Sequence, residues 1–203
     1  MDSEKYYTEF AEACARAIPI DCAKYFKRYD TKELPRVVKT IGFLKSVRPE
    51  SLLDVGPGRG RALWAIANAL PDMKITCVEK SDWRNEVIYA VHAGGVDRIT
   101  THHLDISEGT LFDNDSFDVV SALEVIEHIP NAGAAVSEIV RVAKRFIIIS
   151  VPSKPDNNPD HVHFFTQQKF EELLDQAEEK NNKPIRRVTF EYIPKHMMVT
   201  IRL

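Results

Sequence analysis

The chain has 203 residues, of which 44% are hydrophobic and 28% are charged, a composition typical of one soluble globular domain with a sizeable core. Thirty acidic and 27 basic residues give a formal net charge of −3, which disfavours a broad polyanion-binding surface. The longest strongly apolar run, residues 146–151, is far shorter than the roughly 20 residues that a membrane-spanning helix needs. We therefore expect neither membrane insertion nor DNA binding.

Cysteine usage indicates a reducing compartment. The three cysteines are Cys14, Cys22 and Cys77, an odd number without a Cys-x-x-Cys pair, so neither a disulfide framework nor a zinc knuckle is indicated. The first residues, MDSEKYY, are charged and lack the apolar segment of a signal peptide. We expect a cytoplasmic protein, and the sequence leaves its oligomeric state open.

The sequence predicts that residues 1–35 form a helical extension. The main domain follows and comprises residues 36–203. Phe10, Cys14 and Ala17 lie on one helical face, and Asp21 is suited to cap a short second helix. The tyrosines of this extension are consistent with two interpretations, a lid over the substrate or packing against the helices of the domain. They are Tyr6, Tyr7, Tyr25 and Tyr29.

Strand and helix patterns alternate through the rest of the chain. Seven segments have strand character: 51–55, 74–80, 98–105, 116–123, 145–152, 186–193 and 196–203. Helical patterns of crossover length lie between most of them, and Thr166 is the expected N-cap of the last helix. The final two segments are separated only by Pro194 and Lys195. This order predicts an α/β fold with a mostly parallel seven-stranded sheet, an antiparallel C-terminal hairpin and helices on both faces.

A glycine-rich turn follows the first strand. In LLDVGPGRG, residues 52–60, an aspartate near the end of an apolar run is followed by glycine at every second position. Ligands of open α/β sheets bind at the carboxyl ends of the strands, where glycine lets the backbone approach them closely. The dinucleotide fingerprint would need glycine or alanine where the chain has Arg61, and no Walker phosphate loop occurs. An oxidoreductase is therefore disfavoured.

This stretch resembles the first motif of the class I S-adenosylmethionine-dependent methyltransferases. Later segments resemble the further motifs of that family in the same order. CVEK (77–80) is similar to its second-strand motif, LDI (104–106) to its third, and FDVVSALEVIEHI (117–129) to its fourth strand and the segment after it. The resemblance implies a Rossmann-like class I methyltransferase fold and S-adenosylmethionine as the cofactor.

The resemblance also assigns cofactor-binding roles to individual residues. Asp54 would serve the ammonium group, Glu79 the two ribose hydroxyls and Asp105 the adenine amino group. A carboxylate suits the ribose because it accepts two hydroxyl hydrogen bonds at once. The remaining neighbours would be Gly56, Pro57 and Gly58 at the methionine portion, Lys80 and Ile106 beside adenine, and Leu123 beneath the methionine arm.

The segment 124–128 and two later histidines have two interpretations. In the first, Glu124 borders the acceptor pocket and His161 or His163 acts as a general base. In the second, a divalent metal is held by Glu124, Glu127, His128 and His161. The resemblance of this run to metal-dependent RNA 2′-O-methyltransferases and ubiquinone-pathway O-methyltransferases implies such a site. The first interpretation is favoured, because Glu-x-x-Glu-His is common in members of the family without a metal.

Basic residues form three clusters, each typical of a solvated face. Two of them facing the pocket would make an RNA substrate more plausible. The clusters are Lys24/Lys27/Arg28, Arg141/Lys144/Arg145 and Lys183/Arg186/Arg187.

The expected function is methyl transfer from S-adenosylmethionine to an oxygen, nitrogen or carbon atom of a small molecule. One alternative is a metal-dependent RNA 2′-O-methyltransferase. The alternative of another class is a non-catalytic cofactor-binding subunit that supports a partner.

Overall fold

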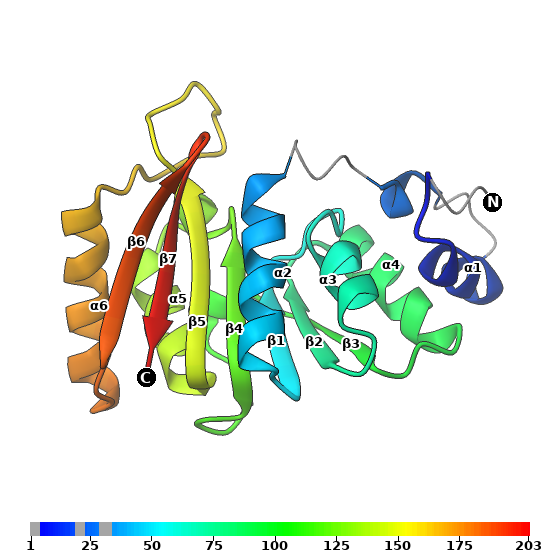
Figure 1. Ribbon diagram of the computed structural model, residues 1–203, viewed down its shortest axis with the longest axis horizontal. Coiled ribbons are helices and arrows are strands. Elements are labelled where there is room, and N and C mark those ends of the chain that lie inside the picture. The colour runs from blue at the N-terminus through cyan, green and yellow to red at the C-terminus, as the bar shows by residue number, and fades with distance from the viewer. Residues whose placement is uncertain (1–4, 19–22, 29–33) are drawn as a thin grey trace. The chain divides into compact units, whose positions relative to one another are not determined.

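The protein is described here by a computed structural model that covers residues 5–18, 23–28 and 34–203. Its strands form a seven-stranded sheet in the order β3-β2-β1-β4-β5-β7-β6, and helices surround it (Figure 1). The sheet is mostly parallel and ends in an antiparallel hairpin, which confirms the predicted fold class. The chain divides into two compact units, the first of residues 1–103 and the second of residues 104–203. In the described ranges, no helix has both the length and the apolar character that a membrane crossing requires.

The first unit alternates helices with the first three strands. Its elements are α1 (Thr8–Ala17), η1 (Ala23–Phe26), α2 (Pro35–Val47), β1 (Ser51–Val55), α3 (Leu63–Ala69), β2 (Lys74–Glu79), α4 (Asp82–Ala93) and β3 (Ile99–His103). Strand β2 pairs in parallel with both β1 and β3. The predicted cap at Asp21 and the residues Cys22 and Tyr29 lie outside the described ranges.

The N-terminal segment packs into this unit through aromatic side chains and one glycine. The buried indole of Trp64 in α3 lies between Phe10 and Phe26, with ring centroids 5.2 and 5.0 Å away. Helix α1 packs on α4 at Gly94, where a Cβ would lie only 1.9 Å from the carbonyl oxygen of Ala13. Glycine at this position therefore lets two helix backbones touch. Phe10, Ala13 and Phe26 thus belong to the packed core of the first unit, while the separation of residues 1–35 as an extension stays a prediction.

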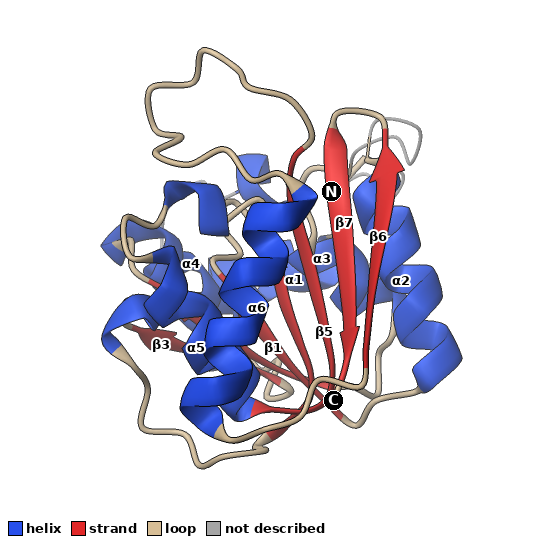
Figure 2. Ribbon diagram, turned by 90° about the vertical axis from the view of Figure 1, so that its left-hand side faces the viewer, coloured by secondary structure: helices blue, strands red, loops and turns tan. Residues whose placement is uncertain are grey.

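The second unit contains the remaining strands and two long helices. Its elements are η3 (Ile106–Glu108), β4 (Phe117–Leu123), η4 (Ile126–His128), α5 (Ala132–Val142), β5 (Ala143–Pro152), α6 (Gln167–Asn181), β6 (Arg187–Ile193) and β7 (His196–Arg202). Figure 2 shows α5 and α6 packed side by side. Thr166 caps α6 as predicted, because its hydroxyl accepts the Lys169 N–H at 3.3 Å.

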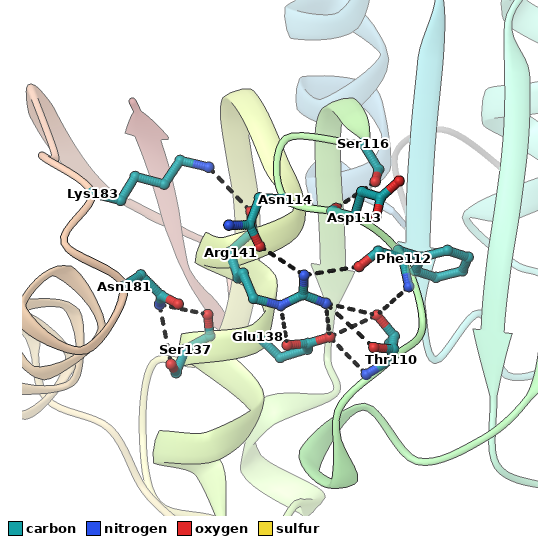
Figure 3. A network of polar contacts seen from close by, with 10 residues as sticks. All are labelled: Thr110, Phe112, Asp113, Asn114, Ser116, Ser137, Glu138, Arg141, Asn181 and Lys183. Atoms are coloured by element: carbon teal, nitrogen blue, oxygen red, sulfur yellow. Dashed lines mark hydrogen bonds and ion pairs between the residues drawn. The ribbon is translucent and has the colours of Figure 1, made fainter.

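A polar network ties the loop before β4 to α5 (Figure 3). Glu138 accepts hydrogen bonds from the backbone N–H and the hydroxyl of Thr110 at 2.7 and 2.6 Å, and from two guanidinium nitrogens of Arg141 at 2.7 and 2.8 Å. Burial alone would raise the pKa of Glu138, but these hydrogen bonds and the charge of Arg141 outweigh it and lower that pKa. In the same region, the ammonium group of Lys183 donates hydrogen bonds to Asp115 and to backbone carbonyls of α5 and β5.

Candidate active site

Three glycines with left-handed backbones form the turn after β1. Gly56, Gly58 and Gly60 have φ values of 62°, 59° and 76°, which residues with a Cβ rarely adopt. The Gly56 N–H donates to the Val78 carbonyl at 2.8 Å and the Gly60 N–H to the Pro57 carbonyl at 2.9 Å, so the turn is tight and tied to β2. Among the described atoms, a Cβ at Gly58 would meet only the Gly56 oxygen, at 3.9 Å. The backbone at Gly58 is therefore open to a ligand.

Glu79, at the end of β2, joins this strand to the glycine turn. Its buried carboxylate accepts the Gly58 N–H on Oε2 and the Ser81 N–H on Oε1, both at 2.9 Å. Hydrogen bonds to an ionised acceptor are strong and compensate its burial. Each carboxylate oxygen has two lone pairs, so Glu79 can accept ribose hydroxyls as well. Its ribose role stays a prediction, and the structure adds a second task, the shaping of the turn.

Negative charge is concentrated at the carboxyl ends of β1 and β2. Asp54 and Cys77 are register partners on these strands, and both side chains are buried. Burial raises the pKa of the Cys77 thiol well above its usual range, and the charges of Asp54 and Glu79 raise it further. Cys77 is therefore a neutral thiol rather than a nucleophile.

Lys80 follows Glu79, and its side chain is exposed. Its carbonyl oxygen lies 3.0 Å from Nε2 of His103, and the same nitrogen lies 3.1 Å from Oδ1 of Asp82. His103, for which the sequence predicts no role, thus links the end of β3 to the turn after β2. The predicted contact of Lys80 with adenine is not tested by these bonds.

The second unit carries the other predicted cofactor residues. Oδ1 of Asp105 accepts the backbone N–H and the hydroxyl of Ser107 at 2.9 and 2.8 Å, so the carboxylate caps η3 and its direction is fixed. Ile106 is buried, and Leu123 is half-buried at the end of β4. Their cofactor roles stay predictions.

Glu124 lies directly after β4 in a left-handed conformation, with φ 59°. Its carboxylate accepts the Ser150 hydroxyl at 2.8 Å on Oε1, and Oε2 lies 3.4 Å from Nε2 of His196. His196 was not predicted from the sequence. Its only sequence signal is its place at the start of β7, where it pairs in register with Pro152 at the end of β5.

Glu127, His128 and His161 form a cluster with the donor set of a metal site. One ligand atom from each lies within 4.8 Å of the others. Nδ1 of His128 bonds the Asp160 carbonyl and Nδ1 of His161 bonds the Asp156 carboxylate, both at 2.9 Å. Because these oxygens only accept, each Nδ1 carries the proton, which leaves Nε2 as the ligating nitrogen. Glu124, the fourth residue of the predicted metal set, is not part of this cluster.

His163, the second predicted base, lies in a different setting. Its Nε2 bonds the Pro130 carbonyl at 3.0 Å, and its ring packs against Phe165 with centroids 5.4 Å apart. Its backbone N–H donates to the Glu127 carbonyl at 3.1 Å. These contacts hold the loop after β5 to η4, so a role in loop placement is supported by geometry and the role of a base stays a prediction.

A separate cavity lies within the first unit. Its volume is about 330 Å³, and it is lined by Tyr6, Tyr7, Thr8, Glu9, Phe10, Arg28 and Asn68. Arg28 stacks over the ring of Tyr7 at 4.9 Å, and Tyr25 contacts Trp83 of α4 and accepts its indole N–H. Of the described tyrosines, Tyr6 and Tyr7 thus line the cavity, and Tyr25 packs against a helix.

Comparison with known families adds the decisive observation. The profile of a family described as a methyltransferase domain matches residues 26–181, more than half of the chain. The chain belongs to this methyltransferase family. It is a class I S-adenosylmethionine-dependent methyltransferase, as the motifs around residues 52–60 predict.

Solved methyltransferases share this fold at low identity. An O-methyltransferase family protein from Burkholderia thailandensis has a TM-score of 0.66 at 13% identity, with 83% of this chain and 55% of that one covered. The 1,6-didemethyltoxoflavin-N1-methyltransferase of the same organism was solved with 1,6-didemethyltoxoflavin and S-adenosylhomocysteine. Its TM-score is 0.63 at 20% identity, with 85% of this chain and 80% of that one covered. The methyltransferase domain of bacterial CtHen1 has a TM-score of 0.62 at 20% identity, with 83% of this chain and 96% of that one covered. The chain spans about half the length of the first of these proteins.

Proposed function

We propose that this methyltransferase acts on an oxygen, nitrogen or carbon atom of a small molecule. The observation that carries the proposal is that two residues of the basic clusters, Arg141 and Lys183, form ion pairs within the protein. Arg141 is bound to Glu138 and Lys183 to Asp115, so the two basic clusters around them have less charge to offer a polyanion. Similar structures named for O-methyl and N1-methyl transfer, the second solved with bound 1,6-didemethyltoxoflavin, support the same class of acceptor.

We infer that residues of the first unit hold the cofactor. S-adenosylmethionine supplies an activated methyl group on a sulfonium. Gly58 would present bare backbone to it, and the carboxylates of Asp54 and Glu79 would hold its ammonium and ribose groups. From the second unit, Asp105 and Ile106 would contact adenine. The protein's contribution to the reaction is proximity and alignment, with a base only where the acceptor must lose a proton.

Calorimetric titration with S-adenosylhomocysteine tests the cofactor assignment. Asp54→Asn and Glu79→Gln should each weaken binding at least tenfold, about 1.4 kcal/mol. Glu86→Gln, which removes an exposed acid from the same unit, is the matched control and should bind like the wild type. Equal affinities in all four proteins would remove both buried acids from the cofactor site.

The acceptor class is tested by release of S-adenosylhomocysteine with a panel of hydroxylated, amino and heteroaromatic small molecules and with short RNA. Turnover of a small molecule and none of RNA supports the proposal. Turnover restricted to RNA would replace it by the second candidate, a metal-dependent RNA 2′-O-methyltransferase.

That second candidate is favoured by the Glu127–His128–His161 cluster. Two imidazoles and a carboxylate suit Mn²⁺ or Zn²⁺, and both rings are oriented through Nδ1 in the way that metal-bound histidines are. A metal held there would polarise a hydroxyl of the acceptor.

Titration of the chelator-treated protein with Mn²⁺ and Zn²⁺ separates the two candidates. For the metal candidate, His161→Ala should weaken metal binding at least tenfold, while the control His102→Ala leaves it unchanged. Full activity after chelation, together with no tight metal binding by the wild type, would eliminate the second candidate.

A further inference from the structure

Glu124 occupies a backbone conformation that favours glycine. It follows the last residue of β4, and its φ is 59°. Non-glycine residues in the left-handed region are uncommon, and backbone strain of this kind clusters at functional sites. The carboxyl end of a strand in an open α/β sheet is also where ligands bind. Conformation and location therefore both single out Glu124.

Neighbouring strands hold the Glu124 carboxylate in place. Ser150 of β5 donates its hydroxyl to Oε1 at 2.8 Å, and the Glu124 N–H donates to the Ser150 carbonyl at 2.9 Å. His196, the first residue of β7, places Nε2 3.4 Å from Oε2. Strands β4, β5 and β7 are consecutive in the sheet, as Figure 1 shows. One carboxylate oxygen is thus hydrogen-bonded from β5, and the other lies near an imidazole of β7, so both contacts come from strands rather than from a loop.

The carboxylate is the member of this group that solvent reaches best. Ser150 is fully buried, and Nδ1 of His196 is buried as well. Of the side-chain surfaces, 23% is exposed in Glu124 and 12% in His196. An incoming molecule therefore meets Glu124 first. An ionised carboxylate only accepts hydrogen bonds, so it selects a partner that donates one.

We propose that Glu124 binds and deprotonates an O–H or N–H group of the acceptor, and that His196 and Ser150 are its positioning residues. The inference rests on the proposed function and narrows it to hydroxyl or N–H acceptors. The acceptor atom forms its bond to the methyl carbon, the carbon–sulfur bond breaks with its electron pair left on sulfur, and the acceptor proton passes to Glu124 and then to water. His196 and Ser150 hold the carboxylate in the direction that this transfer needs.

Paired substitutions of His196 test the positioning role. His196→Leu removes the ring nitrogen near Oε2, whereas His196→Gln keeps an amide N–H in its place. With a hydroxyl or N–H acceptor found in the panel, we expect kcat to fall at least tenfold in His196→Leu and to recover largely in His196→Gln. Affinity for S-adenosylhomocysteine should stay within twofold in both. Glu124→Gln should lose more of kcat than either, and His102→Leu, an exposed histidine of β3, is the control.

The possible outcomes distinguish failure of this inference from failure of the proposed function. Wild-type kcat in His196→Leu, or equal losses in both His196 variants with equal losses of thermal stability, would overturn the positioning role while the proposed function stands. Turnover of carbon acceptors alone would overturn the assignment of Glu124. A wild type that binds S-adenosylhomocysteine and methylates no small molecule would contradict the proposed function, and this inference would fail with it.

Discussion

The contact between Gly60 and Trp64 sets up a sharp prediction. Gly60 has φ 76°, and a Cβ placed on it would lie 2.0 Å from Nε1 of Trp64 and 2.5 Å from Cε2. The indole has no room to withdraw, because it is buried between the rings of Phe10 and Phe26. Gly60→Ala should therefore strain the backbone and overpack the core at once. The substitution in the glycine turn after β1 would therefore also disturb the packing of the N-terminal segment.

The two effects have separable magnitudes. A left-handed backbone costs an L-residue about 1–2 kcal/mol. Overpacking of a well-filled core costs roughly 1–3 kcal/mol more. Gly60→Ala should thus destabilise the protein by about 2–5 kcal/mol. Gly58→Ala is the matched control, because Gly58 has φ 59° in the same turn and a Cβ on it would meet only the Gly56 oxygen, at an ordinary 3.9 Å. It should show the backbone effect alone.

Urea unfolding followed by tryptophan fluorescence measures both variants. The difference between them isolates the clash with Trp64, because the change in unfolded-state entropy is shared. In a Trp64→Leu background the excess effect of Gly60→Ala should disappear, which closes a double-mutant cycle. Equal destabilisation by Gly60→Ala and Gly58→Ala in the wild-type background would refute the packing of the indole beneath the glycine turn.

Three further predictions concern stability. Glu138→Gln should destabilise the protein by about 2 kcal/mol near neutral pH. Because the folded-state pKa of Glu138 lies below its usual 4.5, this deficit should be fully present above pH 4.5 and shrink as pH falls through the folded value. A pH-independent deficit in urea unfolding would contradict the bonding to Arg141. Gly94→Ala should separate α1 from α4 and speed tryptic cleavage of the N-terminal segment, whereas Gly42→Ala, with open space around its Cβ and no positive φ, should not. Thr166→Ala should lower the free energy of unfolding by about 1 kcal/mol, and an unchanged value would show that the cap of α6 is dispensable.

Local patterns in the sequence predict most of the fold. Alternating strand and helix signals, the two-residue break at Pro194 and Lys195, and the cap at Thr166 all correspond to observed elements. These features depend on short-range chemistry, so one sequence suffices to see them. Packing of the N-terminal segment is different. The contact of Gly94 with α1 joins positions 81 residues apart, and no local pattern indicates which surface a helix covers.

The candidate site shows the same division. Asp54, Glu79 and Asp105 lie at or just after strand ends, as the order of the family's motifs predicts, and their cofactor roles stay predictions. The bonds of Glu79 to Gly58 and Ser81 could not be foreseen, since they depend on how the turn folds back on β2. His196 gave no signal because its partner lies 72 residues earlier in the chain and meets it only through the order of β4, β5 and β7.

Glu124 marks the point where local backbone preference and observed structure disagree. With φ 59°, a glycine would fit its backbone at no steric cost, while any L-residue gives up about 1–2 kcal/mol there. The chain nevertheless has a carboxylate at this position, and Ser150 and His196 hold it at 2.8 and 3.4 Å. One hydrogen bond to a charged group contributes about 1.5–3 kcal/mol, enough to offset the strain but not to explain the choice of residue. A backbone that would accept glycine, a carboxylate that Ser150 and His196 contact from two strands, and a position at the carboxyl end of a strand together support the proposal that the side chain of Glu124 serves the reaction rather than the fold.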